Sequence, residues 1–288
     1  MRLRFQPGTP QTHPEAVTLA SRTHGASPML KLEFAELTDV GRARAHNEDS
    51  LGHFAPPSSM EAKTHGWLFA LADGVGGQDR GEVASRLAVE TMLRAFGSAP
   101  ASEGHSAVLS RAVQRANTAV FEAGHGAIAT TIVACGLRFD RAVVAHVGDS
   151  RCYLIRRGRI QQLTRDHTLA NEQAKLGLIS GREAASASNK NLLSRSLGIN
   201  MFVSADTSEH ELAAGDLLVL CSDGLHGPVK ERELAHAATS SRDLKMAAHK
   251  LIDIANELDG GDNVSVQLIR IVEVEHMGMY RGRPYRLR

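Results

Sequence analysis

Cysteine is scarce in this sequence, and that scarcity excludes a disulfide-stabilised fold. The 288 residues include three cysteines, Cys135, Cys152 and Cys221, and each lies inside an apolar stretch. An odd and small number of thiols cannot form a disulfide framework, and a chain of this length can bury a large hydrophobic core without one. We therefore expect free thiols and a reducing, cytoplasmic location.

The sequence also lacks an excess of charge and any long apolar run. Lys and Arg number 33 and Asp and Glu number 32, which gives a formal net charge of +1. Nucleic acids and anionic membranes normally require a basic surface, so this balance predicts neither class of partner. No run approaches the roughly 20 apolar residues of a membrane-spanning helix, and residues 16–20 are too short for a secretory signal. We expect no membrane span.

The two ends differ in composition from the middle of the chain. The first 28 residues carry four prolines among Ser, Thr, His and Gly, without hydrophobic periodicity. We expect residues 1–30 to be a disordered extension, and we hypothesise that Met29 is the native start. Residues 275–288 form a basic tail in which four arginines are interleaved with Tyr280 and Tyr285. A solvated disordered end and a docking arm for an acidic partner are both open interpretations of this tail.

One folded domain is expected between these ends, over residues 31–274. Helical spacing of apolar residues predicts long helices over 81–96, 106–121 and 241–258. Runs of apolar and β-branched residues between turn signals predict strands over 30–37, 67–72, 128–137, 141–147, 151–155, 159–163, 216–221 and 264–272. The short spacing of the middle strands is typical of antiparallel pairing. The fold class predicted is α+β, with two antiparallel β-sheets in a central sandwich flanked by α-helices.

Five separated segments each place an acidic residue at a turn, and four of these turns adjoin a predicted strand. They are Asn47-Glu48-Asp49, Ala72-Asp73-Gly74, Gly148-Asp149-Ser150, Ser222-Asp223-Gly224 and Gly261-Asp262-Asn263. Strands that end in carboxylates can gather several oxygen ligands at one end of a sheet, which suits hard divalent cations. The pattern predicts a metal-dependent hydrolase.

Two of these segments suggest chemistry beyond a turn. Because glycine permits close backbone approach, Asp73-Gly74 can present both a carboxylate and a backbone carbonyl to metal, although an isolated Asp-Gly is more often a plain turn. Arg44 is near Glu48 and Asp49 in the sequence, and its planar guanidinium suits a phosphate. A surface salt bridge is the alternative for any single Arg–Glu pair.

Six collinear motifs extend over residues from about 35 to 272. They are Gly41-x-x-Arg44-x-x-Asn47-Glu48-Asp49, Ala72-Asp73-Gly74-x-Gly76-Gly77, Gly148-Asp149-Ser150-Arg151, Leu163-Thr164-x-Asp166-His167, Ser222-Asp223-Gly224-Leu225 and Asp262-Asn263-Val264-Ser265. In order and spacing they resemble the protein phosphatase 2C family in its compact bacterial form. The resemblance implies a metal-dependent phosphatase that acts on phosphoserine and phosphothreonine, with phosphorylated proteins, a cognate Ser/Thr kinase and that kinase's substrates as partners. It also implies a flap over about 164–198, and we expect a monomer.

The resemblance assigns a role to each acidic motif. By motif position, Asp73 would bridge two Mn²⁺ or Mg²⁺ ions. The other implied metal ligands are the Gly74 carbonyl on the second ion, Asp223 and Asp262 on the first, Glu48 and Asp49 near the second, and Asp149 with Asp223 on a third. Two such ions can share a water and lower its pKa toward about 7, so that hydroxide attacks phosphorus directly. The implied catalytic residues are Arg44, which would stabilise phosphoryl charge, Asp73 and Asp149.

The sequence departs from the family at the proposed general acid. Many members carry histidine after the Asp-Gly, where this chain has Val75, and Gln78 stands where bacterial relatives often have histidine. Three sources for the leaving-group proton stay open: a water held by Asp149 on the third ion, His46 and His167. Either histidine is more often a packing or surface residue.

Three other functions compete with this interpretation. Cys135 and Arg141 satisfy the Cys-x5-Arg spacing of cysteine-dependent phosphatases, but bulky residues fill the intervening loop and a strand follows where that chemistry needs a helix. A pseudophosphatase, which would bind phosphoproteins without hydrolysis, should lack metal carboxylates, yet they are present. A different two-metal enzyme, such as a phosphodiesterase, would add histidine ligands, and none of the five turns supplies one.

Overall fold

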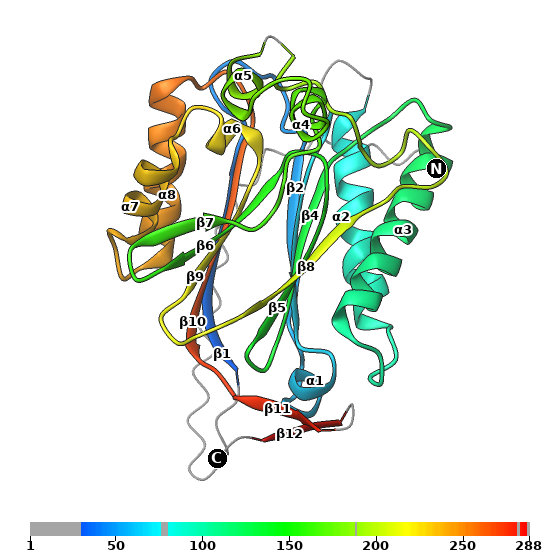
Figure 1. Ribbon diagram of the computed structural model, residues 1–288, viewed down its shortest axis with the longest axis vertical. Coiled ribbons are helices and arrows are strands. Elements are labelled where there is room, and N and C mark those ends of the chain that lie inside the picture. The colour runs from blue at the N-terminus through cyan, green and yellow to red at the C-terminus, as the bar shows by residue number, and fades with distance from the viewer. Residues whose placement is uncertain (1–29, 76–79, 188, 281–282, 287–288) are drawn as a thin grey trace, which may run out of the picture.

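The protein has four layers, in which two β-sheets pack face to face and helices cover both outer faces (Figure 1). The computed structural model describes residues 30–75, 80–187, 189–280 and 283–286. Helices α2 (Gly81–Gly97) and α3 (His105–Gly124) cover one sheet, and α7 (Glu231–Thr239) and α8 (Leu244–Leu258) cover the other. The predicted α+β sandwich is confirmed.

Each sheet has five strands, and every neighbouring pair is antiparallel. The first has the order β1-β10-β9-β6-β7, with bounds Lys31–Asp39, Val264–Glu273, Leu217–Cys221, Arg151–Arg156 and Arg159–Gln162. The second has the order β2-β3-β4-β5-β8, with bounds Asp49–Phe54, Trp67–Asp73, Ile132–Arg138, Arg141–Val147 and Asp206–Glu211.

The central strands are apolar along their whole length because both of their faces are buried. Phe69 and Leu71 of β3 face Leu218 and Leu220 of β9 in the cluster between the sheets. The intervening side chains of the same strands pack against the helices in two further clusters. A strand covered on both sides reads as a continuous hydrophobic run. This is why the sequence predicted β3, β4, β5 and β9 well.

Several elements were not predicted. Strand β2 contains Gly52, where an added Cβ would lie 3.1 Å from a Leu93 methyl carbon of α2, so the helix packs directly on the strand backbone. Strand β8 is an edge strand whose burial alternates and whose six residues are all polar. Helices α1 (Ser59–Thr64), α6 (Asp223–His226) and α7 are too short to give a clear helical period.

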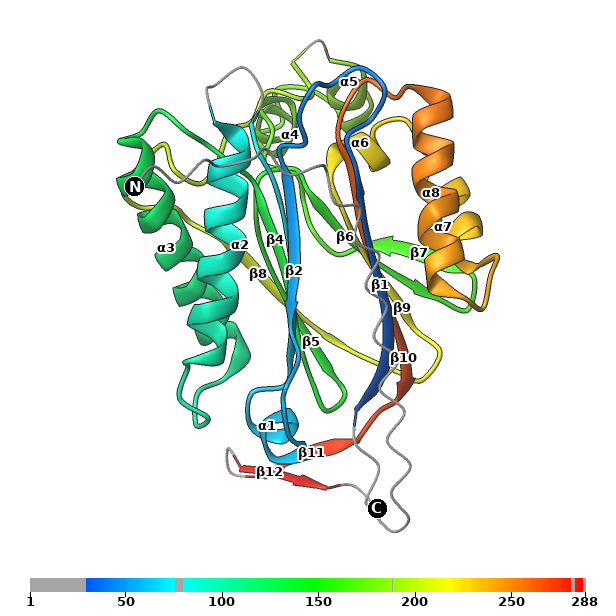
Figure 2. The same ribbon diagram turned by 180° about the vertical axis from the view of Figure 1, so that it is seen from behind.

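The flap lies over one end of the sandwich and the C-terminal segment lies at the other (Figure 2). Helices α4 (Leu169–Lys175) and α5 (Gly181–Ser186) lie within the predicted flap. In the C-terminal tail, β11 (Met277–Tyr280) pairs with β12 (Arg283–Arg286) in a hairpin that neither interpretation of the tail included. The N-terminal extension, apart from Leu30, lies outside the described residues. Within the described residues, no helix combines the length and apolarity needed to cross a membrane.

A buried polar bridge joins the two sheets. The Glu36 carboxylate on β1 accepts hydrogen bonds from His53 Nδ1 on β2 at 2.9 Å and from Gln267 Nε2 on β10 at 2.5 Å. The Gln267 amide also donates to the Gly52 carbonyl. These side chains lie between layers that are otherwise apolar, so the carboxylate provides an acceptor for donors that have little access to water.

We expect Glu36→Ala to lower the free energy of unfolding by about 2 kcal/mol, because the partly buried His53 ring loses its acceptor and the buried Gln267 amide loses one of its two acceptors. Urea unfolding followed by circular dichroism measures this change. Glu33→Ala is the matched control, since Glu33 lies on the same strand with a half-exposed side chain paired to Arg270 and should cost less than about 1 kcal/mol. Equal losses in the two variants would contradict the bridge.

Candidate active site

The five acidic turns meet at one end of the sandwich because the strands that carry them are antiparallel neighbours. Asp49 begins β2 and lies directly opposite Asp73, the last residue of β3. Asp223 follows β9 as the first residue of α6, and Asp262 precedes β10. Asp149 lies in the turn between β5 and β6. Carboxylates that are far apart in the sequence are thus brought into one cluster.

Backbone contacts fix the turn at Asp73. Its N–H donates to Thr131 Oγ1 at 3.0 Å, and its carbonyl accepts from the Thr131 N–H at 2.8 Å. At Gly74 an added Cβ would lie 2.6 Å from the carbonyl of Gly81 and 2.8 Å from that of Glu48. Only glycine fits between these two backbone segments, so the sequence Asp-Gly is required here by close approach.

Asn263 clamps the segment that carries Arg44 against the first sheet. Its side-chain amide donates to the carbonyls of Val40 and His46, and its Oδ1 accepts from the Glu48 N–H at 2.8 Å. Arg44 Nη2 donates to Asp262 Oδ2 at 2.8 Å, as an arginine placed beside metal-type carboxylates would. The clamping role of Asn263 was not predicted, although Asn263 is part of a recognised motif.

Burial and mutual repulsion raise the pKa values of the clustered carboxyl groups. The pKa values of Asp49 and Asp149 are each raised to about 7. Burial is the largest cause of both shifts, and the charge of the neighbouring Asp223 raises both pKa values further. The pKa of Asp73 is raised well above its usual range by burial and by the charges of Asp49 and Asp223. The pKa of Asp223 is raised for the same two reasons, with Asp262 as the neighbouring charge. The protein therefore concentrates negative charge at some cost in stability.

A bound divalent cation fits this donor set. The side-chain donors are oxygens, which hard cations such as Mg²⁺ and Mn²⁺ prefer. Asp49 Oδ2 accepts from Ser222 Oγ at 2.8 Å, whereas the buried Asp49 Oδ1 has no hydrogen-bond partner. A buried, unpaired carboxylate oxygen inside an acidic cluster calls for a positive charge. The described residues thus have the chemistry of a metal centre.

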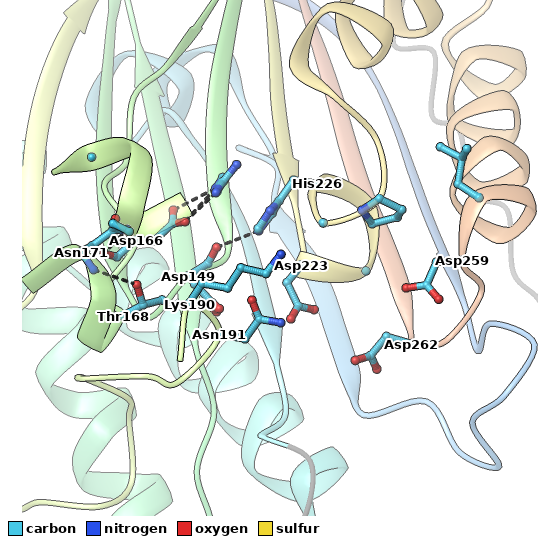
Figure 3. A pocket seen from close by; sticks show the side chains of 17 residues that line it. Asp149, Asp166, Thr168, Asn171, Lys190, Asn191, Asp223, His226, Asp259 and Asp262 are labelled. Carbon is cyan, nitrogen blue, oxygen red and sulfur yellow. Dashed lines mark hydrogen bonds and ion pairs between the residues drawn. The ribbon is translucent and has the colours of Figure 1, made fainter. Parts of the chain in front are cut away.

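Two cavities open from the carboxylates, and both are lined by Asp149, Asp223 and Asp262. One has a volume of about 510 Å³ and includes Arg44, Asp73 and Gly74 in its wall. The other, of about 680 Å³, runs between the flap and the C-terminal end of α8. Figure 3 shows Lys190 and Asn191 of the flap beside Asp149 and Asp223 in this second cavity. Six of the eight predicted site residues line the smaller cavity, whereas Glu48 and Asp49 do not.

Comparison with known proteins identifies the family. The family model described as protein phosphatase 2C matches residues 42–256. The chain belongs to the protein phosphatase 2C family. The serine/threonine phosphatase stp of Listeria welshimeri is 36% identical over 254 residues, which cover 85% of this chain and 96% of that protein.

Solved structures of relatives agree with this identification. The serine/threonine phosphatase PstP of Mycobacterium tuberculosis has a TM-score of 0.74 and 32% identity, covering 84% of this chain and 99% of its own. The catalytic domain of PstP in complex with two manganese ions has a TM-score of 0.72 and 32% identity, covering 85% of this chain and 100% of its own. This protein phosphatase 2C is a metal-dependent serine/threonine protein phosphatase of the bacterial type, as predicted.

The competing enzyme classes do not fit the structure. Cys135 is fully buried in the middle of β4, opposite Phe69 and Val144, and Arg141 begins the next strand, so the two form no phosphate-binding loop. Among the described residues, the wall of the 510 Å³ cavity contains no histidine ligand of the kind expected for a phosphodiesterase. In this protein phosphatase 2C, Cys135 and Arg141 belong to two adjacent strands, β4 and β5, and their Cys-x5-Arg spacing is a coincidence.

The two histidines considered as proton donors lie away from the cavities. The ring of His46 is exposed, and His46 does not line either cavity. His167 is buried, accepts a hydrogen bond from the Gly148 N–H, and stacks on His146 with 4.6 Å between ring centroids. Burial lowers the pKa of His167 to about 4, so it is neutral at pH 7. The structure gives His167 a role in anchoring the flap.

A second group of possible metal ligands lies beside this anchor. His146, His167 and Asp206 offer ligand atoms within 4.8 Å of one another. The histidine rings are nearly parallel, at 20°, so their in-plane lone pairs cannot converge on one ion. Asp206 already pairs with Arg195 at 2.8 Å. The group therefore ties the flap to strands β5 and β8.

Sequence reasoning overlooked His226. Among the described histidines it alone lines either of the two cavities, and its Nε2 donates to the Asp149 carbonyl at 2.9 Å. This bond joins α6, which begins at Asp223, to the turn that carries Asp149. Its position three residues after Asp223 was the available signal, because a four-residue helix places both at the same end of β9.

Proposed function

We propose that the protein hydrolyses phosphoserine and phosphothreonine in proteins at the carboxylate cluster, by direct attack of activated water and without a phosphoenzyme. The observation that carries this proposal is the convergence of Asp73, Asp223 and Asp262 with Arg44 on one cavity. A guanidinium beside clustered carboxylates provides both halves of a phosphoryl site, a cation centre and an anion contact.

The proposed ligands are those that the family motifs imply. Asp73 ends β3 and lines the 510 Å³ cavity, and it would be shared by two Mn²⁺ or Mg²⁺ ions, with the Gly74 carbonyl on one and Asp223 and Asp262 on the other. Asp49 lies opposite Asp73 in the β2–β3 pair, and Glu48 and Asp49 would support the second ion. When bound, the ions lower the pKa of water and polarise the phosphoryl oxygens.

Arg44 would orient the phosphoryl group. It already bonds Asp262 at 2.8 Å, and a single Nη contact leaves other N–H groups of the same guanidinium to donate to phosphoryl oxygens. The Asp262 carboxylate would thus hold the arginine in place while ligating an ion. Such positioning supplies a large share of catalysis in phosphoryl transfer.

Asp149 would hold a third ion together with Asp223. The His226 bond to the Asp149 carbonyl fixes the Asp149 turn, and the bidentate pair of Arg151 with Asp166 braces the adjoining strand. We propose that the leaving-group proton comes from a water at this position, because the rings of His46 and His167 lie outside both cavities.

We further propose that the substrates are proteins phosphorylated by a Ser/Thr kinase in the cytoplasm, and that the protein acts as a monomer. Three buried free cysteines support a reducing compartment. The similarity to bacterial serine/threonine phosphatases supports the substrate class.

The test is phosphate release from a phosphothreonine peptide by the purified full chain, in Mn²⁺ and in EDTA. Turnover that requires Mn²⁺ supports the proposal. No turnover with phosphopeptide binding retained would instead indicate a pseudophosphatase. EDTA-resistant turnover that is lost in Cys135→Ser would overturn the metal site.

A further inference from the structure

One wall of the 510 Å³ cavity is apolar. Leu192, Leu193 and Ile199, which follow the flap helices, share this cavity with Val75 and with the carboxylates of the candidate active site. Leu192 is 58% exposed and Ile199 37% exposed, whereas most leucine and isoleucine side chains in the sandwich are fully buried. Isolated exposed apolar side chains are common, but several that line one functional cavity indicate a binding surface.

Backbone hydrogen bonds hold this wall in place. The Leu192 carbonyl accepts from the Leu169 N–H at 2.8 Å, and the Ser194 N–H donates to the His167 carbonyl at 2.8 Å. Further along, Leu197 and Thr130 exchange two backbone hydrogen bonds. Next to Thr130, the Ala129 carbonyl accepts from the Val75 N–H at 3.0 Å. The apolar side chains are therefore presented by a fixed backbone, which reduces the entropy lost on binding.

The neighbouring cavity differs in chemistry. Away from the shared carboxylates, the 680 Å³ cavity is lined mainly by polar and charged groups, including Asn171, Lys190 and Asp259. A substrate segment that crosses the site thus meets an apolar surface in one direction and a polar surface in the other. This asymmetry can distinguish substrates by the residues near the phosphorylated one.

We propose that Leu192, Leu193 and Ile199, with Val75, form a subsite for an apolar side chain of the substrate, within two residues of the phosphorylated serine or threonine. The inference rests on the proposed function, since the phosphoryl group must enter the same cavity at Arg44 and Asp73. In an extended peptide, a residue two positions away projects on the same face at about 7 Å, so one cavity can take both side chains.

The experiment compares phosphothreonine peptides that differ at one position. Leu, Ala, Lys or Glu is placed in turn at each of the two positions on either side of the phosphothreonine, and kcat/KM is measured in saturating Mn²⁺. We expect Leu to exceed Glu by at least about tenfold at one position, because an apolar pocket discriminates by this order. In Leu192→Ser, kcat/KM for the peptide with Leu at that position should exceed that for the peptide with Glu by no more than about threefold. Leu192→Met should keep the original ratio.

Leu178→Ser is the matched control. Leu178 lies in the same flap and is 69% exposed, but it does not line the cavity, so its loss should change neither peptide ratio nor hydrolysis of p-nitrophenyl phosphate. The subsite would be overturned if peptides with Leu and with Glu had equal kcat/KM at all four positions. If p-nitrophenyl phosphate were still hydrolysed in Mn²⁺, the phosphatase proposal would stand. The subsite is likewise overturned if the preference persists unchanged in both Leu192→Ser and Ile199→Ser. Absence of hydrolysis of either substrate type in Mn²⁺ would overturn both proposals.

Discussion

Asp73→Asn is expected to reduce phosphopeptide hydrolysis by at least about 10³-fold in saturating Mn²⁺. The substitution keeps the size of the side chain but removes the charge that two ions would share. Initial rates of phosphate release from a phosphothreonine peptide measure the effect. Asp253→Asn, an exposed carboxylate on α8 outside both cavities, should retain full activity.

The same substitution should stabilise the protein when metal is absent. The pKa of Asp73 is raised by burial and by the charges of Asp49 and Asp223, so its ionised form opposes folding. In EDTA we expect Asp73→Asn to unfold at a higher temperature than the unmodified protein, whereas added Mn²⁺ should raise its midpoint less. A variant with lost activity and a lower midpoint in EDTA would indicate simple misfolding and contradict this account.

The stabilisation provided by Mn²⁺ is expected to grow as the pH rises from about 5.5 to 7.5. Asp49 and Asp149 have pKa values of about 7 in the folded protein, raised from 3.8 by burial first and by neighbouring carboxylates second. Between pH 5.5 and about 7 the carboxyl groups of the folded state hold protons that the unfolded state has lost, so the stability of the metal-free protein falls as the pH rises. For one such carboxyl the change between pH 5.5 and 7.5 is on the order of 2 kcal/mol, because stability falls by about 1.4 kcal/mol per pH unit only up to the folded pKa of about 7.

Urea unfolding at pH 5.5, 6.5 and 7.5, in EDTA and in Mn²⁺, measures this difference. Five of the described histidines have lowered pKa values and act in the opposite direction below about pH 6.5, namely His105, His146, His167, His210 and His226. Their contribution is largely common to both conditions, so the difference between Mn²⁺ and EDTA isolates the carboxylates. A difference that stays constant with pH would contradict the proposed repulsion. In Asp73→Asn the difference should be smaller at every pH.

Individual elements show how far the sequence could predict this structure. Strand β9 is five apolar residues between turn signals, and both of its faces are buried, so local composition was sufficient. Strand β8 has the sequence Asp-Thr-Ser-Glu-His-Glu and is a strand because it pairs with the edge of β5. Only tertiary pairing gives such a polar segment its conformation.

The candidate site shows the same division. Asp73, Asp149, Asp223 and Asp262 were predicted because each carboxylate directly adjoins a turn signal and matches a family motif. Asn263 and His226 act through hydrogen bonds to the segments that carry Arg44 and Asp149. Asn263 is 217 residues from His46, and His226 is 77 residues from Asp149. No local sequence pattern could assign contacts over such separations.

The sequence by itself determined the family, the two-sheet architecture and the acidic residues of the site, since these depend on local composition and on motifs read in order. The tertiary structure decided which carboxyl groups are buried together and hence have raised pKa values. It also separated His167 from both cavities and placed Leu192 and Ile199 in one wall with Val75. Burial and electrostatic repulsion depend on distances between segments remote in the chain, and those distances exist only once the antiparallel strands have paired.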